Sequence, residues 1–202
     1  MSPEVRIGSG KFKGRMVHTQ AGDYRPTTGL VKKSLFDTLS DEIEGSRWLD
    51  LFSGSGAVGL EALSRGAAFV VFVDMSPARL AILRKNLESL GIDKASSRII
   101  PMDYQDALER LRRQHEQFDF VYVDPPYGKI DPAAILADIV TSGILADAGL
   151  VIYQVDKRGV GDVIKSIPAE LYPLRERVLG GTALLFIRWR ESHLKSSEGP
   201  CP

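Results

Sequence analysis

Residues 48–65 read Trp48-Leu-Asp-Leu-Phe-Ser-Gly-Ser-Gly-Ala-Val-Gly-Leu-Glu-Ala-Leu-Ser-Arg65. The apolar start predicts a strand, and the helical spacing of apolar residues after Gly56 predicts a helix. Gly54, Gly56 and Gly59 match the glycines of a nucleotide-binding turn between a strand and a helix. Such a turn lets a ligand approach the backbone and directs helix N–H groups toward it. The stretch therefore predicts the first half of a nucleoside-binding α/β fold.

Two acidic residues lie near the ends of the first two strands of this half. Asp74 ends the apolar run Phe69–Val73, and its spacing from Gly56 fits a carboxylate that binds both hydroxyls of a ribose. The alternative is a helix cap ahead of Pro77. Asp50 lies in the strand before the glycines, where nicotinamide sites are normally apolar. Its carboxylate suits a ligand with a positively charged amino group.

A second motif, Asp124-Pro125-Pro126-Tyr127, follows the apolar run Phe118–Val123. The run predicts a buried strand, and the prolines hold the chain extended beyond it without donating backbone hydrogen bonds. Their carbonyls and the Asp124 carboxylate can accept hydrogen bonds from an exocyclic amine. Tyr127 provides a ring that can stack on a planar base. A proline-rich turn that merely closes the strand is the alternative for this motif alone. The glycine turn upstream favours the base-binding interpretation.

With Asp50, the glycine turn and the Asp-Pro-Pro-Tyr motif, the sequence resembles the class I S-adenosylmethionine-dependent methyltransferases that act on amino groups. Within this class it is similar to the bacterial 16S ribosomal RNA guanine-N2 methyltransferase family that modifies guanine 966. The similarity is carried by the motifs at 6–15, 25–28, 31–36 and 60–67 and extends over residues 5 to about 190. Gly29 and Lys33 depart from the acidic residues usual in that family.

The resemblance implies a doubly wound, Rossmann-like α/β fold whose seven-stranded, mostly parallel sheet has its last strand antiparallel. A β-hairpin (5–7 and 15–19) and a helix capped by Thr27 or Thr28 precede it. The sequence patterns of strands and helices alternate, as a parallel sheet covered by helices on both faces requires. The expected elements are 47–52, 56–65, 69–74, 77–90, 97–101, 104–114, 118–124, 132–142, 149–155 and 159–166. A final hairpin joins 172–178 to 183–190 through Gly180 and Gly181. We expect one domain over 1–190 and a disordered tail over 191–202.

The resemblance also implies S-adenosylmethionine as the cofactor. Its predicted binding residues are Asp50, Phe52, Ser53, Gly54, Ser55, Gly56, Asp74, Met75, Asp103 and Tyr104. Asp103 would bind the adenine amino group, cap the following helix, or do both. Met75 is expected on the adenine face or in the core, and Asn86 is expected to close hydrogen bonds within the fold. The predicted catalytic residues are Asp124, Pro125, Pro126 and Tyr127.

Basic residues are concentrated near the N-terminus although the whole chain has a formal net charge of zero. Residues 1–40 contain three acidic residues and seven basic ones, which are Arg6, Lys11, Lys13, Arg15, Arg25, Lys32 and Lys33. Such a segment suits RNA phosphates, and the candidate RNA-binding residues are Lys11, Lys13, Arg15 and Arg25. A solvated basic surface without a partner is the alternative.

The composition is typical of a small soluble enzyme. An apolar content of 44% over 202 residues suffices for one core. The single cysteine, Cys201, excludes an internal disulfide, and the scattered His18, His115 and His193 predict no metal site. Without a signal pattern or a long apolar run, we expect a cytoplasmic monomer that does not enter a membrane.

The predicted reaction is methyl transfer from S-adenosylmethionine to the N2 amine of a guanine in 16S rRNA, within an assembling small-subunit particle. Asp124 and the Pro125 carbonyl would orient the amine, while Tyr127 would stack on the flipped base. Three alternatives remain: methylation of DNA adenine or cytosine, methylation of a protein glutamine amide, and a nicotinamide-nucleotide-binding protein.

Overall fold

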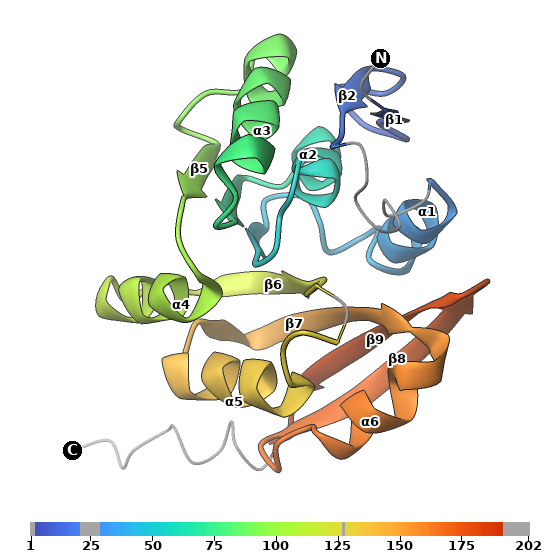
Figure 1. Ribbon diagram of the computed structural model, residues 1–202, viewed down its shortest axis with the longest axis vertical. Helices are drawn as coiled ribbons and strands as arrows, with labels where there is room; N and C mark the ends of the chain where they lie inside the picture. The colour runs from blue at the N-terminus through green and yellow to red at the C-terminus, as the bar shows by residue number, and fades with distance from the viewer. Residues whose placement is uncertain (1–2, 21–28, 127, 192–202) are drawn as a thin grey trace. The chain divides into compact units, whose positions relative to one another are not determined.

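The computed structural model describes residues 3–20, 29–126 and 128–191 (Figure 1). The chain separates into two units, residues 1–107 and 108–202. The predictions for Arg25, for a helix cap at Thr27 or Thr28, for Tyr127 and for the tail over 192–202 fall outside the described residues.

The first unit begins with the predicted hairpin and helix. Strands β1 (Glu4–Arg6) and β2 (Met16–His18) pair antiparallel, and helix α1 (Gly29–Thr38) follows. The helix buries an apolar stripe, and its Phe36 ring stacks on Trp48 with 5.5 Å between ring centroids. Aromatic stacking of this kind adds to the hydrophobic gain of burial, so α1 is attached to the start of the sheet.

Three parallel strands form the sheet of the first unit: β3 (Arg47–Asp50), β4 (Phe69–Val73) and β5 (Ser97–Ile100). The connections are helix α2 (Ala57–Ser64) and helix α3 (Pro77–Leu90), and helix α4 (Tyr104–Arg113) follows β5. All three strands point the same way, so the loops after them emerge at one edge of the sheet. The predicted cofactor residues follow these strand ends.

The glycines and helix caps of the sequence explain why α2 and α3 lie where they do. A Cβ atom on Gly59 would approach Phe72 to 2.3 Å, so only glycine permits this contact of α2 with β4. Ser76 caps α3 by accepting a hydrogen bond from the Arg79 N–H, Pro77 occupies the first turn, and Gly91 ends the helix in the left-handed region.

The second unit contains one parallel and two antiparallel strand pairs. Its elements are β6 (Phe118–Val123), α5 (Pro132–Ser142), β7 (Leu145–Asp156), η1 (Lys157–Gly159), α6 (Val160–Lys165), β8 (Leu171–Leu179) and β9 (Thr182–Trp189). Strand β6 pairs parallel with β7, and the last strand, β9, pairs antiparallel with both β7 and β8.

The strand order β5-β4-β3-β6-β7-β9-β8 confirms the predicted seven-stranded, mostly parallel sheet with an antiparallel last strand. The largest boundary error is at β7, which begins at Leu145, before the predicted start at 149. The register against β6 shifts between Phe118 and Phe120, which pair with Leu145 and Leu150. The segment 146–149, which contains Asp147 and Gly149, is the extra length at this irregularity, and in the sequence it resembles a turn.

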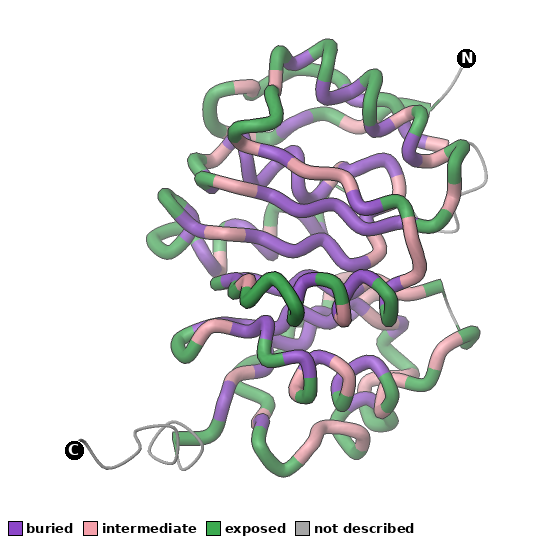
Figure 2. The backbone as a smooth tube through the Cα atoms, turned by 90° about the vertical axis from the view of Figure 1, so that its left-hand side faces the viewer, coloured by how far each residue is buried: buried purple, intermediate pink, exposed green. Residues whose placement is uncertain are grey.

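The strands carry the core of each unit, as the buried stretches in Figure 2 show. Trp48 and Phe72 are fully buried in the first unit, and Tyr122 and Phe186 are buried in the second. No helix within the described ranges is long and apolar enough to cross a membrane.

Candidate active site

The glycine turn after β3 adopts a conformation that its sequence permits. Gly54 and Gly56 have positive φ angles of 54° and 86°, in the region that favours glycine. The Ser53 N–H donates to the Val73 carbonyl at 2.8 Å, and the Gly54 N–H donates to Asp74 Oδ2 at 2.9 Å. The turn is therefore fastened to the end of β4.

Asp74 organises the loop between β4 and α3. Besides the bond from Gly54, its Oδ1 accepts a hydrogen bond from the Ser76 N–H at 2.7 Å, and Arg79 Nη1 lies 3.7 Å from Oδ2. Ser76, not Asp74, is the cap residue of α3. The helix-cap alternative for Asp74 is thus replaced by a loop-bridging role, while ribose binding by its remaining acceptor positions stays a prediction.

Asp50 is a buried carboxylate at the end of β3, with only 2% of its surface exposed. Its Oδ2 accepts a hydrogen bond from the Gly59 N–H at 3.2 Å, within the first turn of α2. A carboxylate near a helix N-terminus is stabilised by the helix dipole. This arrangement places a carboxyl group beside the glycine turn, where the predicted amino group of the ligand would bind.

The Ser53 hydroxyl has no hydrogen-bond partner within the part of the chain that the structure describes. Ser53 is 8% exposed, and among the described residues nothing bonds its Oγ. A Cβ atom on the neighbouring Gly54 would meet nothing within 4 Å. A buried hydroxyl usually finds a partner, so an unsatisfied one beside open space fits a turn that binds a polar ligand.

Phe52, Met75 and Asp103 lie in the loops after β3, β4 and β5, and Tyr104 is the first residue of α4. The Phe52 and Tyr104 rings pack with their centroids 5.4 Å apart, which brings the first and third loops together. Asp103 Oδ1 accepts a hydrogen bond from the Gln105 N–H at 2.9 Å, as the cap interpretation predicted. Met75 is 71% exposed, so the core alternative for this residue was wrong.

Asn86 connects the glycine turn to the N-terminal hairpin. Its side-chain Nδ2 donates to the Ser55 carbonyl at 3.0 Å and to the His18 carbonyl at 2.9 Å. Its Oδ1 accepts from the His18 N–H at 2.9 Å. Asn86 is fully buried, and the prediction that it closes hydrogen bonds within the fold is confirmed.

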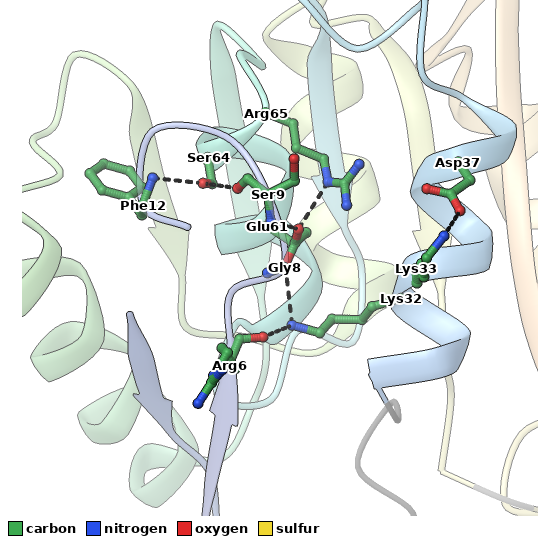
Figure 3. Close-up of polar contacts among 10 residues, drawn as sticks. All are labelled: Arg6, Gly8, Ser9, Phe12, Lys32, Lys33, Asp37, Glu61, Ser64 and Arg65. Atoms are coloured by element: carbon green, nitrogen blue, oxygen red, sulfur yellow. Dashed lines mark hydrogen bonds and ion pairs between the residues drawn. The ribbon is translucent and has the colours of Figure 1, made fainter. Parts of the chain in front are cut away.

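The N-terminal loop between β1 and β2 is held by a buried glutamate, which the sequence had not singled out as a site residue (Figure 3). Glu61 on α2 accepts hydrogen bonds from the Gly8 N–H at 2.8 Å and the Ser9 N–H at 3.1 Å. It also pairs with Lys32 Nζ at 3.3 Å and Arg65 Nε at 2.9 Å. Burial lowers the pKa of Lys32, and its attraction to Glu61 opposes that shift.

These contacts correct the predicted distribution of basic charge. Lys32 is 3% exposed and paired with Glu61, so it is not available to phosphates. Lys33 is exposed, but it pairs with Asp37 one turn further along α1 (Figure 3). An ion pair at this spacing is an ordinary feature of a helix surface. The basic surface of the N-terminal segment is therefore smaller than the sequence suggested.

Three of the four predicted RNA-binding residues are exposed on this hairpin and its loop: Lys11, Lys13 and Arg15. Lys11 Nζ lies 5.3 Å from the centre of the Phe12 ring, and its backbone N–H donates to the Ser64 carbonyl. Arg15 Nη2 donates to the Ser89 carbonyl at 2.8 Å. The loop is thus fixed by backbone bonds while its lysine side chains face solvent.

In the second unit, the acidic-prolyl motif follows β6 directly. Asp124, Pro125 and Pro126 lie beyond the last strand residue, and exposure rises from half-buried Asp124 to exposed Pro126. Asp124 Oδ2 accepts a hydrogen bond from Gln154 Nε2 at 2.9 Å, and Gln154 Oε1 accepts one from the Tyr122 hydroxyl at 2.7 Å. The sequence offered a signal for Gln154, because an amide is unusual in a strand that is otherwise apolar and buried.

Among the described residues, no group of three or more His, Cys, Asp or Glu side chains is placed to hold a metal ion. The polar groups of the strand-end loops are instead carboxylates, hydroxyls and backbone N–H groups. They are suited to an organic ligand with hydroxyl and amino groups and to an amine substrate.

Known proteins resemble this chain over most of its length. The family described as Conserved hypothetical protein 95 matches residues 5–188. Ribosomal RNA small subunit methyltransferase D of Escherichia coli strain K12 is 34% identical over 185 residues, which are 90% of this chain and 88% of that protein.

Solved structures agree with this relationship. A hypothetical protein of Thermus thermophilus superposes with a TM-score of 0.76 at 31% identity, covering 91% of this chain and 99% of the other. A methyltransferase structure solved in complex with SAH shares the fold, with a TM-score of 0.69 at 20% identity over 85% of this chain and 52% of that one. The chain therefore belongs to the Conserved hypothetical protein 95 family and is a relative of ribosomal RNA small subunit methyltransferase D, as its motifs predicted.

Proposed function

We propose that this protein transfers a methyl group from S-adenosylmethionine to the exocyclic N2 amine of a guanine in 16S ribosomal RNA. The observation that carries the proposal is the Asp124-Pro125-Pro126 motif at the end of β6, whose carboxylate is oriented by a hydrogen bond from Gln154. The name of the Escherichia coli relative supports rRNA of the small subunit as the substrate class.

The residues of the first unit fit the cofactor. Asp50 would hold the amino group of its methionine part, Asp74 the ribose hydroxyls, and Asp103 or its neighbouring backbone the adenine amine. The unpartnered Ser53 hydroxyl and the open space at Gly54 suit the close approach of such a ligand. When bound, S-adenosylmethionine supplies a methyl group that its positive sulfur has already activated.

Asp124 and the Pro125 carbonyl act on the amine. The lone pair of a guanine N2 amine is delocalised into the ring, so the amine is a poor nucleophile. Hydrogen bonds from its two N–H groups to Asp124 and to the Pro125 carbonyl favour a localised lone pair and hold it in one direction. Asp124 then accepts the proton that the methylated amine releases. Positioning and preorganised acceptors supply most of the acceleration.

RNA binding falls to the exposed side chains of the N-terminal loop. Lys11, Lys13 and Arg15 would contact phosphates of the RNA. Arg25 would bind the RNA as well, and Tyr127 would stack on the target base. With Lys32 and Lys33 paired within the protein, the basic surface is modest. We therefore propose an assembling small-subunit particle as the substrate, in which ribosomal proteins present the RNA, and a cytoplasmic monomer as the working form.

The test is transfer of tritiated methyl groups to small-subunit particles from cells that lack this methylation. Wild type is compared with Asp124→Ala, and with Asp147→Ala as a control at an exposed position. We expect N2-methylguanine in 16S rRNA with wild type and the control, and a loss of about 10²–10³ in rate with Asp124→Ala. Transfer into DNA or protein amides, with none into rRNA, would overturn the substrate assignment.

A further inference from the structure

The Asp124 carboxylate belongs to a chain of hydrogen bonds that runs into the core of the second unit. Gln154 Nε2 donates to Asp124 Oδ2 at 2.9 Å, and the Tyr122 hydroxyl lies 2.7 Å from Gln154 Oε1. Gln154 is 8% exposed and Tyr122 is 2% exposed. A buried polar network of this kind rigidifies its members when it is satisfied.

The chemistry of the three groups sets the direction of every bond. An ionised carboxylate can only accept, so Gln154 must turn its NH₂ group toward Asp124. Its carbonyl oxygen then faces Tyr122, and the hydroxyl there must donate. Tyr122 therefore selects the amide orientation, and the amide in turn holds the plane of the carboxylate.

The backbone supports this arrangement. Tyr122 lies near the end of β6, and Asp124 is the first residue after this strand. Gln154 lies on β7, which pairs with β6 through Tyr122 with Ile152 and through Val123 with Tyr153. The partner of Gln154 on β9 is the apolar Leu184, and the titratable groups that form hydrogen bonds with Gln154 among the described residues are Tyr122 and Asp124.

We infer that Gln154 is the positioning residue of the methyl transfer, and that Tyr122 fixes Gln154 in turn. This inference rests on the proposed function and deepens it. A carboxylate offers about four acceptor positions, and the Gln154 N–H occupies one of them. The bond from Gln154 keeps the carboxylate in one orientation, so its oxygens meet the substrate amine in a fixed direction.

The experiment compares Gln154→Met, Gln154→Glu and Tyr122→Phe with wild type, using Gln114→Glu and Tyr172→Phe as matched changes outside the network. Gln154→Met removes the donor, and we expect kcat to fall about 10- to 100-fold while KM for RNA and cofactor is kept. Tyr122→Phe leaves the amide free to turn and should lower kcat less. Both controls should behave as wild type.

Gln154→Glu distinguishes positioning from packing. Two carboxyl groups in contact share one proton, and the introduced carboxyl group, when protonated, can donate to Asp124 as the glutamine does. Activity of this variant should approach wild type at low pH and fall as the shared proton is lost with rising pH. A purely structural role predicts no new pH dependence, and an unchanged kcat and pH profile in all three variants would overturn the inference.

A second readout does not require the RNA. In the ¹⁵N spectrum, the side-chain amide of Gln154 should exchange slowly with solvent and should shift in Asp124→Ala and Tyr122→Phe, but not in Tyr172→Phe. An amide that exchanges rapidly with solvent, and whose resonance does not shift in Asp124→Ala or Tyr122→Phe, would overturn the inference even if methyl transfer were confirmed. Conversely, an inactive wild type with these spectral changes would overturn the proposed function and leave the network established.

Discussion

Glu61 and Asp124 are carboxylates in different units, and they are held in opposite ways. Glu61 lies within α2, is 1% exposed, and accepts bonds from two backbone N–H groups and two cationic side chains. Asp124 lies half-buried at the end of a strand and accepts a bond from the neutral amide of Gln154. A buried carboxylate surrounded by cations of its own chain stabilises the fold, whereas we expect a half-buried carboxylate oriented by an amide to act on a substrate.

Replacing Glu61 by Gln should give the largest change in stability. The amide leaves Lys32 buried without its counter-charge, and breaking a buried pair costs about 3–5 kcal/mol in the free energy of unfolding. Urea denaturation measures this loss, with Glu88→Gln as an exposed control on α3. A loss below about 1 kcal/mol would mean that Glu61 is no more structural than a surface acid.

Replacing Asp124 by Asn should separate activity from stability. We expect methyl transfer to slow by about 10²–10³, or roughly 3–4 kcal/mol in the barrier. The free energy of unfolding should change by less than about 1.5 kcal/mol, because the asparagine oxygen still accepts the bond from Gln154. Rate assays and denaturation on the same preparation check both parts. A stability loss as large as that of Glu61→Gln would remove the contrast between the two carboxylates.

Gly10→Ala tests how firmly the N-terminal loop is seated beside Glu61. A Cβ atom there would lie 1.7 Å from the Ser64 carbonyl oxygen, and the φ of Gly10 is 77°. We expect a loss of about 1–3 kcal/mol and a weaker RNA affinity, because the loop that carries Lys11 must move. Gly14→Ala is the matched control, since Gly14 also has a positive φ but its Cβ would meet nothing within 4 Å. Equal losses in both variants would show that strain alone matters, without displacement of the loop.

Glu109, on the exposed surface of α4, is a third carboxylate to compare with Glu61 and Asp124. We expect its contribution to stability to be the smallest of the three. Hydrogen bonds from Arg112 and then Arg113 lower its pKa to about 2. A lowered pKa contributes stability that is present above the ordinary value and is lost as pH falls from about 4.5 to about 2. Carboxyl ¹³C titration should show this midpoint, and Arg112→Ala should raise it. A midpoint near 4.5 in the wild type would contradict the ion pairs on this helix.

The features that local sequence specifies were predicted correctly. The glycine turn, the cap at Asp103 and the final hairpin each depend on residues a few positions apart. Turn and cap preferences act over such short distances, so they can be recognised without knowledge of the fold. The early start of β7 was missed because its extra residues look like a turn and pair only through an irregular register.

The partners of the charged and polar side chains were decided by tertiary structure alone. By its sequence, Lys32 is one basic residue among seven near the N-terminus, yet packing of α1 and α2 turns it inward onto Glu61. Gln154 and Asp124 are thirty positions apart, and only the pairing of β6 with β7 brings them together. The motifs, their order and the class of fold could be recognised without any structure. Which charges remain on the surface, and which donor orients Asp124, depends on long-range packing, because a pattern of residue types does not specify which side chains will meet.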